Sequence, residues 1–304
     1  MNKFQVTILG CGSATPTLRH FPTSQIVNIR EKLSMVDCGE GTQLQLRKYH
    51  INFIDLRNVF ISHLHGDHCL GLVGMISSFG LLGRTANLHI YAQKELEDVL
   101  MQQLDLFCHK PDFEIVFHAI NPKEYTAIYE DRSMTVYTIP LKHSVPSCGF
   151  LFKEKPTLPH IKRDMIDFYG IPVSQINNIK NGADWVTEDG TIIPNSRLTT
   201  PADPVRSYAY CSDTAYRETI IPYIKDATLL YHEATYTKDL LERAKKNMHS
   251  TAEQAATIAV KAEVKQLMVG HYSARYESID PILNEAKAVF DNTIAAKEGL
   301  IVEL

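Results

Sequence analysis

The chain has 304 residues, 44% of them hydrophobic, and a formal net charge of −4 at neutral pH. This predicts a globular protein with a sizeable core, in one large domain or two small ones, and the negative charge argues against broad, non-specific adhesion to nucleic acid. The longest apolar runs contain Ser and Gly and fall short of the roughly 20 residues that cross a bilayer, so no membrane association is expected.

The N-terminal sequence MNKFQVTILG predicts a first strand, because it lacks the long apolar segment and the cleavage site of a signal peptide. We therefore expect a cytoplasmic location. The cysteines are scattered, and none forms a C-x-x-C pair, which predicts reduced thiols rather than disulfides or ligands of a structural zinc. These cysteines are Cys11, Cys38, Cys69, Cys108, Cys148 and Cys211.

Apolar runs and their spacing predict strands and helices in a mixed order along the chain. Consecutive strands combined with strand–helix alternation favour sheets covered by helices over a purely alternating doubly wound fold. Strands are expected near residues 3–9, 24–30, 33–37, 57–61, 87–91, 113–119, 133–139, 148–152, 207–212, 227–231 and 265–269. Amphipathic helices are expected near 42–49, 68–82, 93–108, 237–247, 251–262 and 279–290.

The stretch GCGSATPT follows the first predicted strand and invites comparison with a dinucleotide-binding loop. The third glycine of G-x-G-x-x-G is absent, since Thr15 occupies that position, and no helix pattern follows directly. A tight turn explains the glycines, and no nucleotide cofactor is expected.

Three histidines and an aspartate lie within six residues of SHLHGDHCLG, just after the apolar run NVFI. In an extended segment His63 and His65 project to the same side, while Asp67 and His68 stand near the start of the next predicted helix. A lone histidine is more often a surface or hydrogen-bonded residue than a ligand. Clustered imidazoles offer no packing benefit without a metal, so these four side chains indicate a metal site.

Three more ligand-type residues each follow an apolar, strand-like run: His143 after TVYTIPLK, Asp213 after SYAYCS and His271 after LMVG. Strand ends deliver residues to a site from a rigid scaffold, although each residue alone has an equally good structural explanation. Together with the first cluster they form a set of five histidines and two aspartates. This set suits two zinc ions with Asp213 bridging them.

Residues 153–206 depart from the pattern of the rest of the chain, being rich in Pro, Lys, Asp and Asn. A loop of this length in a compact domain is usually functional or has its own small structure. We therefore expect a single domain over residues 1–304 with an inserted, protruding arm at 153–206. A disordered insertion is the alternative. Apolar surface for packing is offered by Ile171, Ile176, Ile179, Trp185 and Val186.

The motif HLHGDH, with His143, Asp213 and His271, resembles the metallo-β-lactamase superfamily, whose α/β fold is a four-layer αββα sandwich with the metal site at one edge of its two sheets. More specific stretches resemble the ribonuclease Z family of endonucleases, which mature the 3′ ends of tRNA. The combination of HEAT, HST and DCGEGTQ separates this family from other hydrolases of the superfamily. The matching stretches, which span nearly the whole chain, are ILGCGSATPT, VDCGEGTQLQL, HLHGDHCLGLVG, YCSDT, HEAT, HST and GHYSARY.

The resemblance implies two zinc ions per chain and assigns a ligand set to each. It also implies that Asp67 orients or deprotonates the attacking water. Two cations roughly 3.5–4 Å apart can generate a hydroxide near neutral pH and stabilise displacement at a phosphodiester, which in this family leaves a 3′-hydroxyl on the tRNA. The implied ligands are His63, His65 and His143 for one zinc, and Asp67, His68 and His271 for the other, with Asp213 between them.

The HEAT and HST stretches support the site in this family, where a Glu and His pair helps the leaving 3′ oxygen. The resemblance therefore implies catalytic roles for Glu233 and His249. The structural alternative is a simple helix N-terminus, with Ser250 and Thr251 as the cap and Glu253 as its capping partner.

Two features depart from the family pattern. Where many relatives have an Arg-Asn pair after the first glycine turn, this chain has Arg19-His20-Phe21-Pro22. The Gly-Pro element of the tRNA-binding arm of bacterial relatives is not visible in residues 153–206. Neither change touches the metal ligands, and both concern the way the tRNA is held.

The arm begins with a basic stripe. Lys and Arg contacts to phosphates supply sequence-independent affinity for RNA, so the stripe and the resemblance predict a tRNA-binding exosite. A solvated, charged loop is the alternative. The expected partners are precursor tRNA and, from the family, a second copy in a homodimer. The basic stripe consists of Lys153, Lys155, His160, Lys162 and Arg163.

These observations predict a zinc-dependent endoribonuclease that removes 3′ trailers from precursor tRNA. Two alternatives stay open. One is another hydrolase of the same fold that acts on small phosphodiesters or other esters, and the other is an RNA-binding subunit that keeps the fold without turnover. The presence of all seven ligand residues argues against the non-catalytic subunit.

Overall fold

The computed structural model describes residues 3–108 and 111–304, which form two compact units. Residues 3–153 and 206–304 are called the body below, and residues 154–205 are called the arm. Among the described residues, no helix has the length and apolar character needed to span a membrane. All six cysteines are free thiols.

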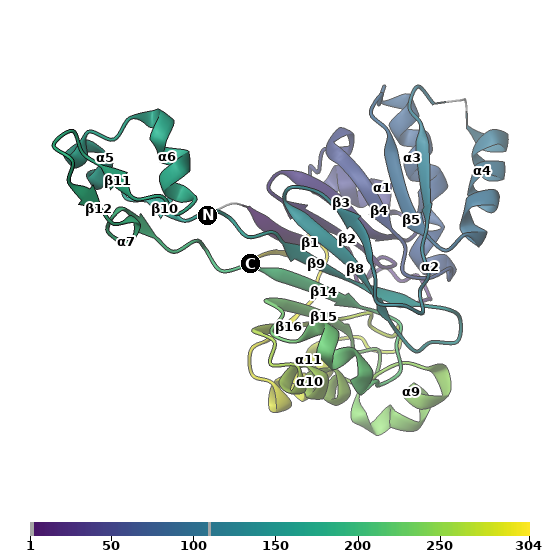
Figure 1. Cartoon of the computed structure of the whole chain (residues 1–304). Helices are drawn as coiled ribbons and strands as arrows, with labels where there is room; N and C mark the ends of the chain where they lie inside the picture. The colour runs from purple at the N-terminus through teal and green to yellow at the C-terminus, as the bar shows by residue number, and fades with distance from the viewer. Residues whose placement is uncertain (1–2, 109–110) are drawn as a thin grey trace. The chain divides into compact units, whose positions relative to one another are not determined.

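The first sheet of the body has the strand order β18-β1-β2-β3-β4-β5-β6 in the described part of the chain (Figure 1). Strands β1 to β3 pair antiparallel, and β3 to β6 run parallel. The last strand of the chain pairs with the first, which closes one edge of this sheet. The bounds are β1 (Phe4–Gly10), β2 (Ser24–Ile29), β3 (Lys32–Cys38), β4 (Leu56–Phe60), β5 (Leu88–Ala92), β6 (Ile115–Ala119) and β18 (Ile301–Glu303).

The second sheet has the order β17-β16-β15-β14-β9-β8-β7 within the described ranges. Strands β14 to β17 run parallel, β9 pairs antiparallel with β14, and β7 with β8 form a hairpin. The bounds are β7 (Ala127–Glu130), β8 (Met134–Pro140), β9 (Cys148–Glu154), β14 (Ser207–Cys211), β15 (Leu229–Glu233), β16 (Gln266–Gly270) and β17 (Thr293–Ala295).

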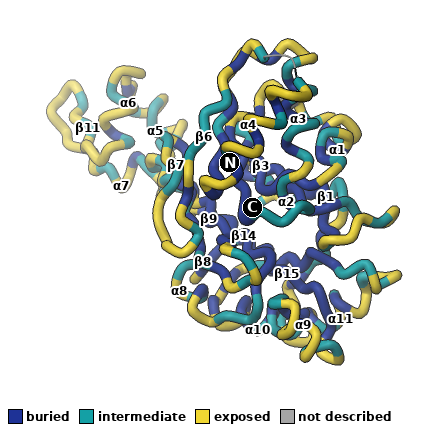
Figure 2. The backbone as a smooth tube through the Cα atoms, turned by 90° about the vertical axis from the view of Figure 1, so that its right-hand side faces the viewer, coloured by how far each residue is buried: buried dark blue, intermediate teal, exposed yellow. Residues whose placement is uncertain are grey.

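The two sheets face each other across the main core, and helices cover the outer face of each sheet (Figure 1). Successive side chains of a strand point to opposite faces, so Ile8 lies in the core between the sheets while Leu9 packs under the helices. Val36 and Met35 divide in the same way. Strands buried on both faces explain the continuous apolar runs of the sequence, and they are the darkest segments in Figure 2.

Helices α1, α3 and α4 cover the first sheet, and α10 and α11 cover the second. Their inner faces are apolar, whereas their outer faces are exposed (Figure 2). The helices of the body are α1 (Thr42–Lys48), α2 (Gly66–Cys69), α3 (Gly71–Leu81), α4 (Glu95–Phe107), α8 (Ile221–Ile224), α9 (Leu241–Asn247), α10 (Ala252–Lys261) and α11 (Asp280–Val289). Single 3₁₀ turns are η1 (Phe53–Asp55), η2 (Glu218–Ile220) and η3 (Lys238–Leu240).

The predicted strands correspond to β1–β6, β8, β9 and β14–β16. The helix predicted for residues 68–82 is present as α3, but its predicted start is wrong, because residues 66–69 form the separate short helix α2 and the two helices meet at Leu70. There Gly71 lies so close to the backbone of Gly39 that a Cβ would meet its carbonyl oxygen at 2.1 Å. The prediction missed the short edge strands β7, β17 and β18, which are held by pairing with neighbours rather than by an apolar pattern of their own.

The arm has a small core of its own, with two short antiparallel strand pairs and three helices. Ile171 and Ile179 are buried in that core with Ile193 and Leu198, whereas Val186 is exposed. The elements are β10 (His160–Ile161), α5 (Arg163–Tyr169), α6 (Val173–Lys180), β11 (Trp185–Val186), β12 (Ile192–Ile193), α7 (Asn195–Leu198) and β13 (Thr199–Thr200).

Candidate metal centre

Loops at the ends of strands from both sheets bring the seven predicted ligands together. His63 and His65 follow β4, and the next turn, α2, carries Asp67 and His68. His271 directly follows β16. The remaining two, His143 and Asp213, follow β8 and β14. The ligand atoms gather into two groups, each within 4.8 Å: His63, His65, His143 and Asp213 in one, and Asp67, His68 and His271 in the other.

In the first group three imidazole nitrogens point toward one another. His65 Nδ1 lies 3.0 Å from His63 Nε2 and 3.2 Å from His143 Nε2. The opposite nitrogens are engaged elsewhere, because His143 Nδ1 donates to the carbonyl of Met248 at 3.1 Å and His63 Nδ1 lies 3.0 Å from Ser62 Oγ. The Ser62 hydroxyl donates to Asp37, so it accepts from His63. Two of the converging nitrogens are therefore lone pairs without a proton.

In the second group, too, the nitrogens that point away from the cluster are hydrogen-bonded. His68 Nδ1 donates to Asp37 Oδ2 at 2.8 Å. His271 Nδ1 donates to Thr235 Oγ1 at 2.9 Å, since the Thr235 hydroxyl itself donates to Glu233. The Nε2 atoms of both histidines face the cluster and are buried without a hydrogen-bond partner. Burial lowers the pKa of His68, but the Asp213 and Asp37 carboxylates outweigh it and raise that pKa well above the usual value, so a bound cation would take the place of a proton there. Asp213 Oδ1 lies 3.2 Å from the first and 3.0 Å from the second, but is not aligned for a hydrogen bond.

This donor set fits divalent metal ions. Buried lone pairs that face each other repel unless a cation lies between them, and imidazole with carboxylate is a set that suits zinc. Asp213 reaches both groups, with Oδ1 toward His68 and His271, and with Oδ2 at 3.6 Å from His63 Nε2. A carboxylate in that position can bridge two ions.

Asp213, Asp67 and His63 have the charge states that metal ligands require. Burial raises the pKa of Asp213, but His271, His68 and His63 outweigh it and hold that pKa well below the usual value. Burial raises the pKa of Asp67, but the neighbouring His271 and His68 outweigh it and lower that pKa. Burial and the neighbouring His68 lower the pKa of His63. Both carboxylates thus stay ionised, and His63 stays neutral.

Several site residues have left-handed backbone conformations, which non-glycine residues adopt at a cost. The φ angles are 59° for Asp213, 60° for His271 and 56° for both Asp37 and Met248. At Asp213 and His271 this conformation turns the chain sharply as it leaves the strand. Part of the backbone strain of the chain thus lies where ligands are aimed.

Sequence reasoning missed the role of Asp37, although it lies within the DCGEGTQ motif. Its buried carboxylate accepts hydrogen bonds from Ser62 N at 2.8 Å, from Tyr210 Oη at 2.6 Å and from His68 Nδ1. It therefore fixes the tautomer and orientation of a ligand histidine. The available signal was its place after the apolar run LSMV, which matches the strand-end position of Asp213.

Glu233 and His249 lie beside the cluster. Glu233 ends β15, is fully buried and accepts four hydrogen bonds, from Thr214 N, Thr235 Oγ1, His249 Nδ1 and Ser250 N. The His249 ring lies 5.1 Å from that of His143 between centroids. Burial lowers the pKa of His249, but the Glu233 carboxylate outweighs it and raises that pKa to about 9. Because Nδ1 is held by Glu233, the second ring nitrogen of His249, Nε2, is the one available for other contacts.

The remaining HEAT and HST residues have structural contacts. His232 is buried within β15, where its Nδ1 donates to the carbonyl of Glu233. Thr251 caps α10, with a capping box formed with Gln254. The expected capping partner Glu253 is wrong, because that side chain pairs with Lys238 at 2.9 Å. The Thr251 helix cap and the His249–Glu233 hydrogen bond are both present. A capping role and a catalytic role for this loop therefore do not exclude each other.

Comparison with known sequences gives matches along the whole chain. The family model described as anti-Pycsar protein Apyc1 matches residues 4–161. A protein named ribonuclease Z from Bacteroides fragilis is 57% identical over 304 residues and is covered over 100% of both chains. Another of that name, from Porphyromonas gingivalis, is 48% identical over 304 residues, with 100% of both chains covered.

Comparison with solved structures identifies the fold. The crystal structure of the short form of human tRNase Z has a TM-score of 0.70 at 22% identity, with 98% of each chain covered. The metallo-β-lactamase fold protein YhfI from Bacillus subtilis has a TM-score of 0.68 at 20% identity, with 100% of each chain covered. These likenesses, with two sheets flanked by helices, confirm the predicted four-layer αββα sandwich.

Proposed function

The chain belongs to the ribonuclease Z family and is an endoribonuclease that processes the 3′ ends of tRNA, and we propose that it cuts precursor tRNA at a two-zinc centre and leaves a 3′-hydroxyl on the tRNA. The observation that supports this centre is the convergence of imidazole nitrogens, two of them buried without a hydrogen-bond partner, on the Asp67 and Asp213 carboxylates. We place this activity in the cytoplasm.

Two ligand sets would hold the zinc ions. Bound there, the ions would lower the pKa of a water molecule toward neutrality and offset the charge of the scissile phosphate. Asp213 faces both sets through its two oxygens. The sets are His63, His65 and His143 for one ion and Asp67, His68 and His271 for the other, with Asp213 shared.

Asp67 is the general base in this proposal. Its carboxylate is kept ionised by His271 and His68, and it lies 8% exposed at the rim of a cluster whose other carboxylate, Asp213, is more deeply buried. An ionised carboxylate at that rim can accept the proton of an attacking water and hold the water in line with the phosphorus atom.

His249 donates the proton to the leaving 3′ oxygen in this proposal, and Glu233 positions it. All four hydrogen bonds to Glu233 come from protein groups, so its oxygens are already occupied. Its carboxylate instead holds His249 Nδ1 at 2.9 Å and favours the imidazolium. That arrangement leaves His249 Nε2–H as the acid, while Glu233 acts through His249.

We further propose that the arm grips the body of the tRNA. In the basic stripe, Lys153, His160 and Arg163 are exposed. Two of its members already have partners, since Lys162 Nζ donates to the carbonyl of Arg197 and His160 lies 3.3 Å from Asp203. Outside the stripe the acidic residues of the arm outnumber the basic residues Lys180 and Arg197, so we place the phosphate contacts mainly on the stripe.

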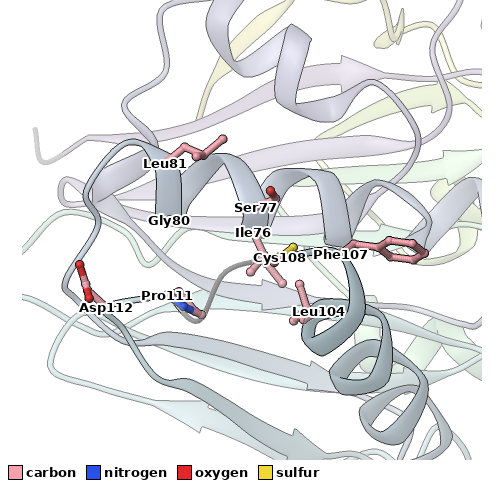
Figure 3. Close-up of a pocket in the computed structure, with 9 residues that line it drawn as sticks. All are labelled: Ile76, Ser77, Gly80, Leu81, Leu104, Phe107, Cys108, Pro111 and Asp112. Carbon is pink, nitrogen blue, oxygen red and sulfur yellow. The ribbon is translucent and has the colours of Figure 1, made fainter.

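We also propose a homodimer through the ends of α3 and α4. Leu81 is 82% exposed, and Leu106 and Phe107 are 75% and 70% exposed. Leu81 and Phe107 line a pocket of about 300 Å³ between the two helix ends, where Figure 3 shows Leu81 on α3 and Leu104 and Phe107 on α4. Exposed apolar surface of this kind on a folded protein marks an interaction site, and a second copy would cover it.

One assay tests the proposed function. Purified protein is incubated with a 3′-extended tRNA precursor, before and after removal of metal with a chelator, and both new RNA ends are sequenced. We expect a tRNA with a 3′-hydroxyl, loss of cleavage after chelation and recovery with zinc. Cleavage that survives complete metal removal, or a cyclic phosphate at the tRNA end, would contradict the proposal.

The same assay separates the alternatives. A hydrolase of small esters would cleave a nitrophenyl phosphodiester but leave the precursor intact. A non-catalytic subunit would bind the precursor and cleave neither substrate.

A further inference from the structure

A second cluster of ligand-type side chains lies outside the metal centre, where the N-terminal and C-terminal segments of the body meet. His20 Nδ1 lies 3.5 Å from Cys11 Sγ and 3.1 Å from Glu298 Oε2. Cys11 Sγ is 3.6 Å from Glu298 Oε1. One ligand atom from each residue falls within 4.8 Å of the others, as in the two groups of the main centre.

The backbone around this cluster holds the three side chains in place. Gly12 donates to the carbonyl of Phe21 at 2.9 Å, and a Cβ on Gly12 would stand 3.1 Å from His20 Cβ. His20 N donates to Thr17 Oγ1, which closes the loop on itself. Glu298 accepts from Phe21 N at 2.9 Å. The loop thus packs against the end of β1, and Glu298 fastens it from the C-terminal side.

The chemistry of the set selects the kind of ion. A thiol with an imidazole favours borderline or soft cations over magnesium or calcium, which prefer oxygen ligands only. Zinc with bond lengths of 2.0–2.3 Å in tetrahedral geometry separates its ligand atoms by about 3.3–3.6 Å. His20 Nδ1 lies 3.5 Å from Cys11 Sγ and 3.1 Å from Glu298 Oε2, near that range, and the other carboxylate oxygen, Oε1, lies 3.6 Å from Cys11 Sγ.

We propose that Cys11, His20 and Glu298 bind a third zinc ion, in a structural site separate from the two-zinc centre. Cys11 is fully buried, while the His20 and Glu298 side chains are 20% and 12% exposed, so the ion enters from the side of the latter two. The carbonyl of Ala296, 3.5 Å from Cys11 Sγ, or a water completes the coordination. Binding releases the thiol proton to solvent.

The site would fasten a loop that supports the main centre. The same loop carries Pro22, whose Cβ lies 2.5 Å from the place a Cβ on Gly39 would occupy, and Asp67 O lies equally close to that point. Cys11 and His20 come from the loop between β1 and β2, and Glu298 from the segment before β18, so an ion bound by all three would cross-link these two segments. Without an ion they form a hydrogen-bonded triad, so stripped protein stays folded.

Cobalt is the probe that tests this site, because a thiolate bound to cobalt gives a near-ultraviolet charge-transfer absorption. The proposed two-zinc centre contains no cysteine, so its cobalt cannot produce that band. Full-length protein is stripped with chelator and titrated with Co²⁺ under reducing conditions. We expect three equivalents of Co²⁺ to bind per chain and the thiolate band to grow with only one of them. Added zinc should displace the cobalt and abolish the band.

Variants assign the band to this cluster. Cys11→Ser should abolish the band and remove one equivalent, and His20→Asn should weaken binding of that equivalent at least tenfold, as expected for loss of a ligand. Cys69→Ser is the matched control, because Cys69 Sγ lies 3.4 Å from the carbonyl of His65 and is the thiol beside the main centre. This variant should keep the band.

Each result tests the third zinc site independently of whether the protein cleaves tRNA. Parent protein that shows no thiolate band, or a band that persists in Cys11→Ser, would overturn the proposal. If Cys11→Ser does not fold, His20→Asn carries the test, and an unchanged third equivalent in that variant would overturn the proposal as well.

Discussion

At the residue scale, the metal centre depends on which nitrogen of each histidine carries the proton. Asp37, Thr235 and the carbonyl of Met248 each engage the nitrogen that points away from the cluster. The other nitrogen then points into the cluster, where a cation can bind it. Metal affinity is therefore set as much by these supporting groups as by the ligands themselves.

Asp67→Ala removes both a ligand and the proposed base. Cleavage of precursor tRNA should fall by about 10³-fold or more, since general base help alone contributes about 10²–10⁴ in rate. The measurement is single-turnover cleavage together with metal analysis. Asp55→Ala, at an exposed carboxylate, is the matched control. Undiminished turnover of Asp67→Ala would contradict the mechanism.

His249→Ala separates help to the leaving group from metal binding. The RNA leaving group is a poor one, so its cleavage should fall by about 10²–10⁴. A nitrophenyl phosphodiester has a good leaving group and should lose far less activity, with metal content unchanged. Equal losses on both substrates, or loss of zinc, would instead assign His249 a structural or ligand role.

At the element scale, strands position the ligands and helix ends complete the loops around them. Asp37 lies near the end of β3, and the segments that carry His63, His143, Asp213 and His271 leave the ends of the largely buried strands β4, β8, β14 and β16. A rigid strand fixes where its last residue lies, which a long surface loop cannot do. The loop that carries His249 is fixed from the other side, by the capping box of α10.

Thr251→Ala should lower the free energy of unfolding by about 1 kcal/mol, because it removes the cap of α10. Urea unfolding of metal-matched samples measures this loss. Glu253→Ala is the control and should change stability by less than about 0.5 kcal/mol, since it breaks only an exposed ion pair. A larger loss for Glu253→Ala than for Thr251→Ala would show that the cap was assigned to the wrong residue.

Replacing residues 154–205 with a short Gly/Ser linker tests the arm. Lys153 and Ser207 lie opposite each other on β9 and β14, so a short linker can join them without moving the body. Hydrolysis of a nitrophenyl phosphodiester should stay nearly intact. Binding and cleavage of precursor tRNA should drop at least about tenfold and lose much of their salt dependence.

A finer variant keeps the arm folded. Replacing Lys155, Lys162 and Arg163 with Gln should weaken tRNA binding in the same direction, whereas changing Asp164 and Asp167 to Asn should not weaken it. If the shortened protein processes tRNA like the parent, the grip lies on another surface.

At the scale of the whole molecule, contacts between distant parts of the chain close the body. β18 pairs with β1, and the loop before β18 meets the first glycine turn through Glu298. The face formed by the ends of α3 and α4 is left exposed on a single chain. The contacts that close the body thus lie on other elements than the proposed dimer face.

Leu81→Asp and Phe107→Asp should each convert the proposed dimer into a monomer, because a charge in an apolar interface must be desolvated. Sedimentation velocity at several concentrations measures the mass. Val260→Asp, at a 47% exposed apolar residue on α10, is the control and should leave the dimer intact. A monomeric parent protein, or variants that remain dimeric, would count against this interface.

The sequence by itself determined the α/β class, the main strands and the residues that gather at the metal centre. Strands buried on both faces leave continuous apolar runs, and His143, Asp213 and His271 stand where such runs end. Short edge strands such as β7 and β17 were missed, because neighbouring strands hold them by backbone pairing, which leaves little trace in a three- or four-residue segment.

Only the tertiary structure decided which side chains support the ligands. Asp37 reaches His68, which is 31 positions away, and Thr235 reaches His271, which is 36 positions away. The Cys11, His20 and Glu298 cluster is the extreme case, because Glu298 lies 278 positions from His20. A search for closely spaced cysteines could not find it, since the three residues become neighbours only when the two ends of the chain pack together.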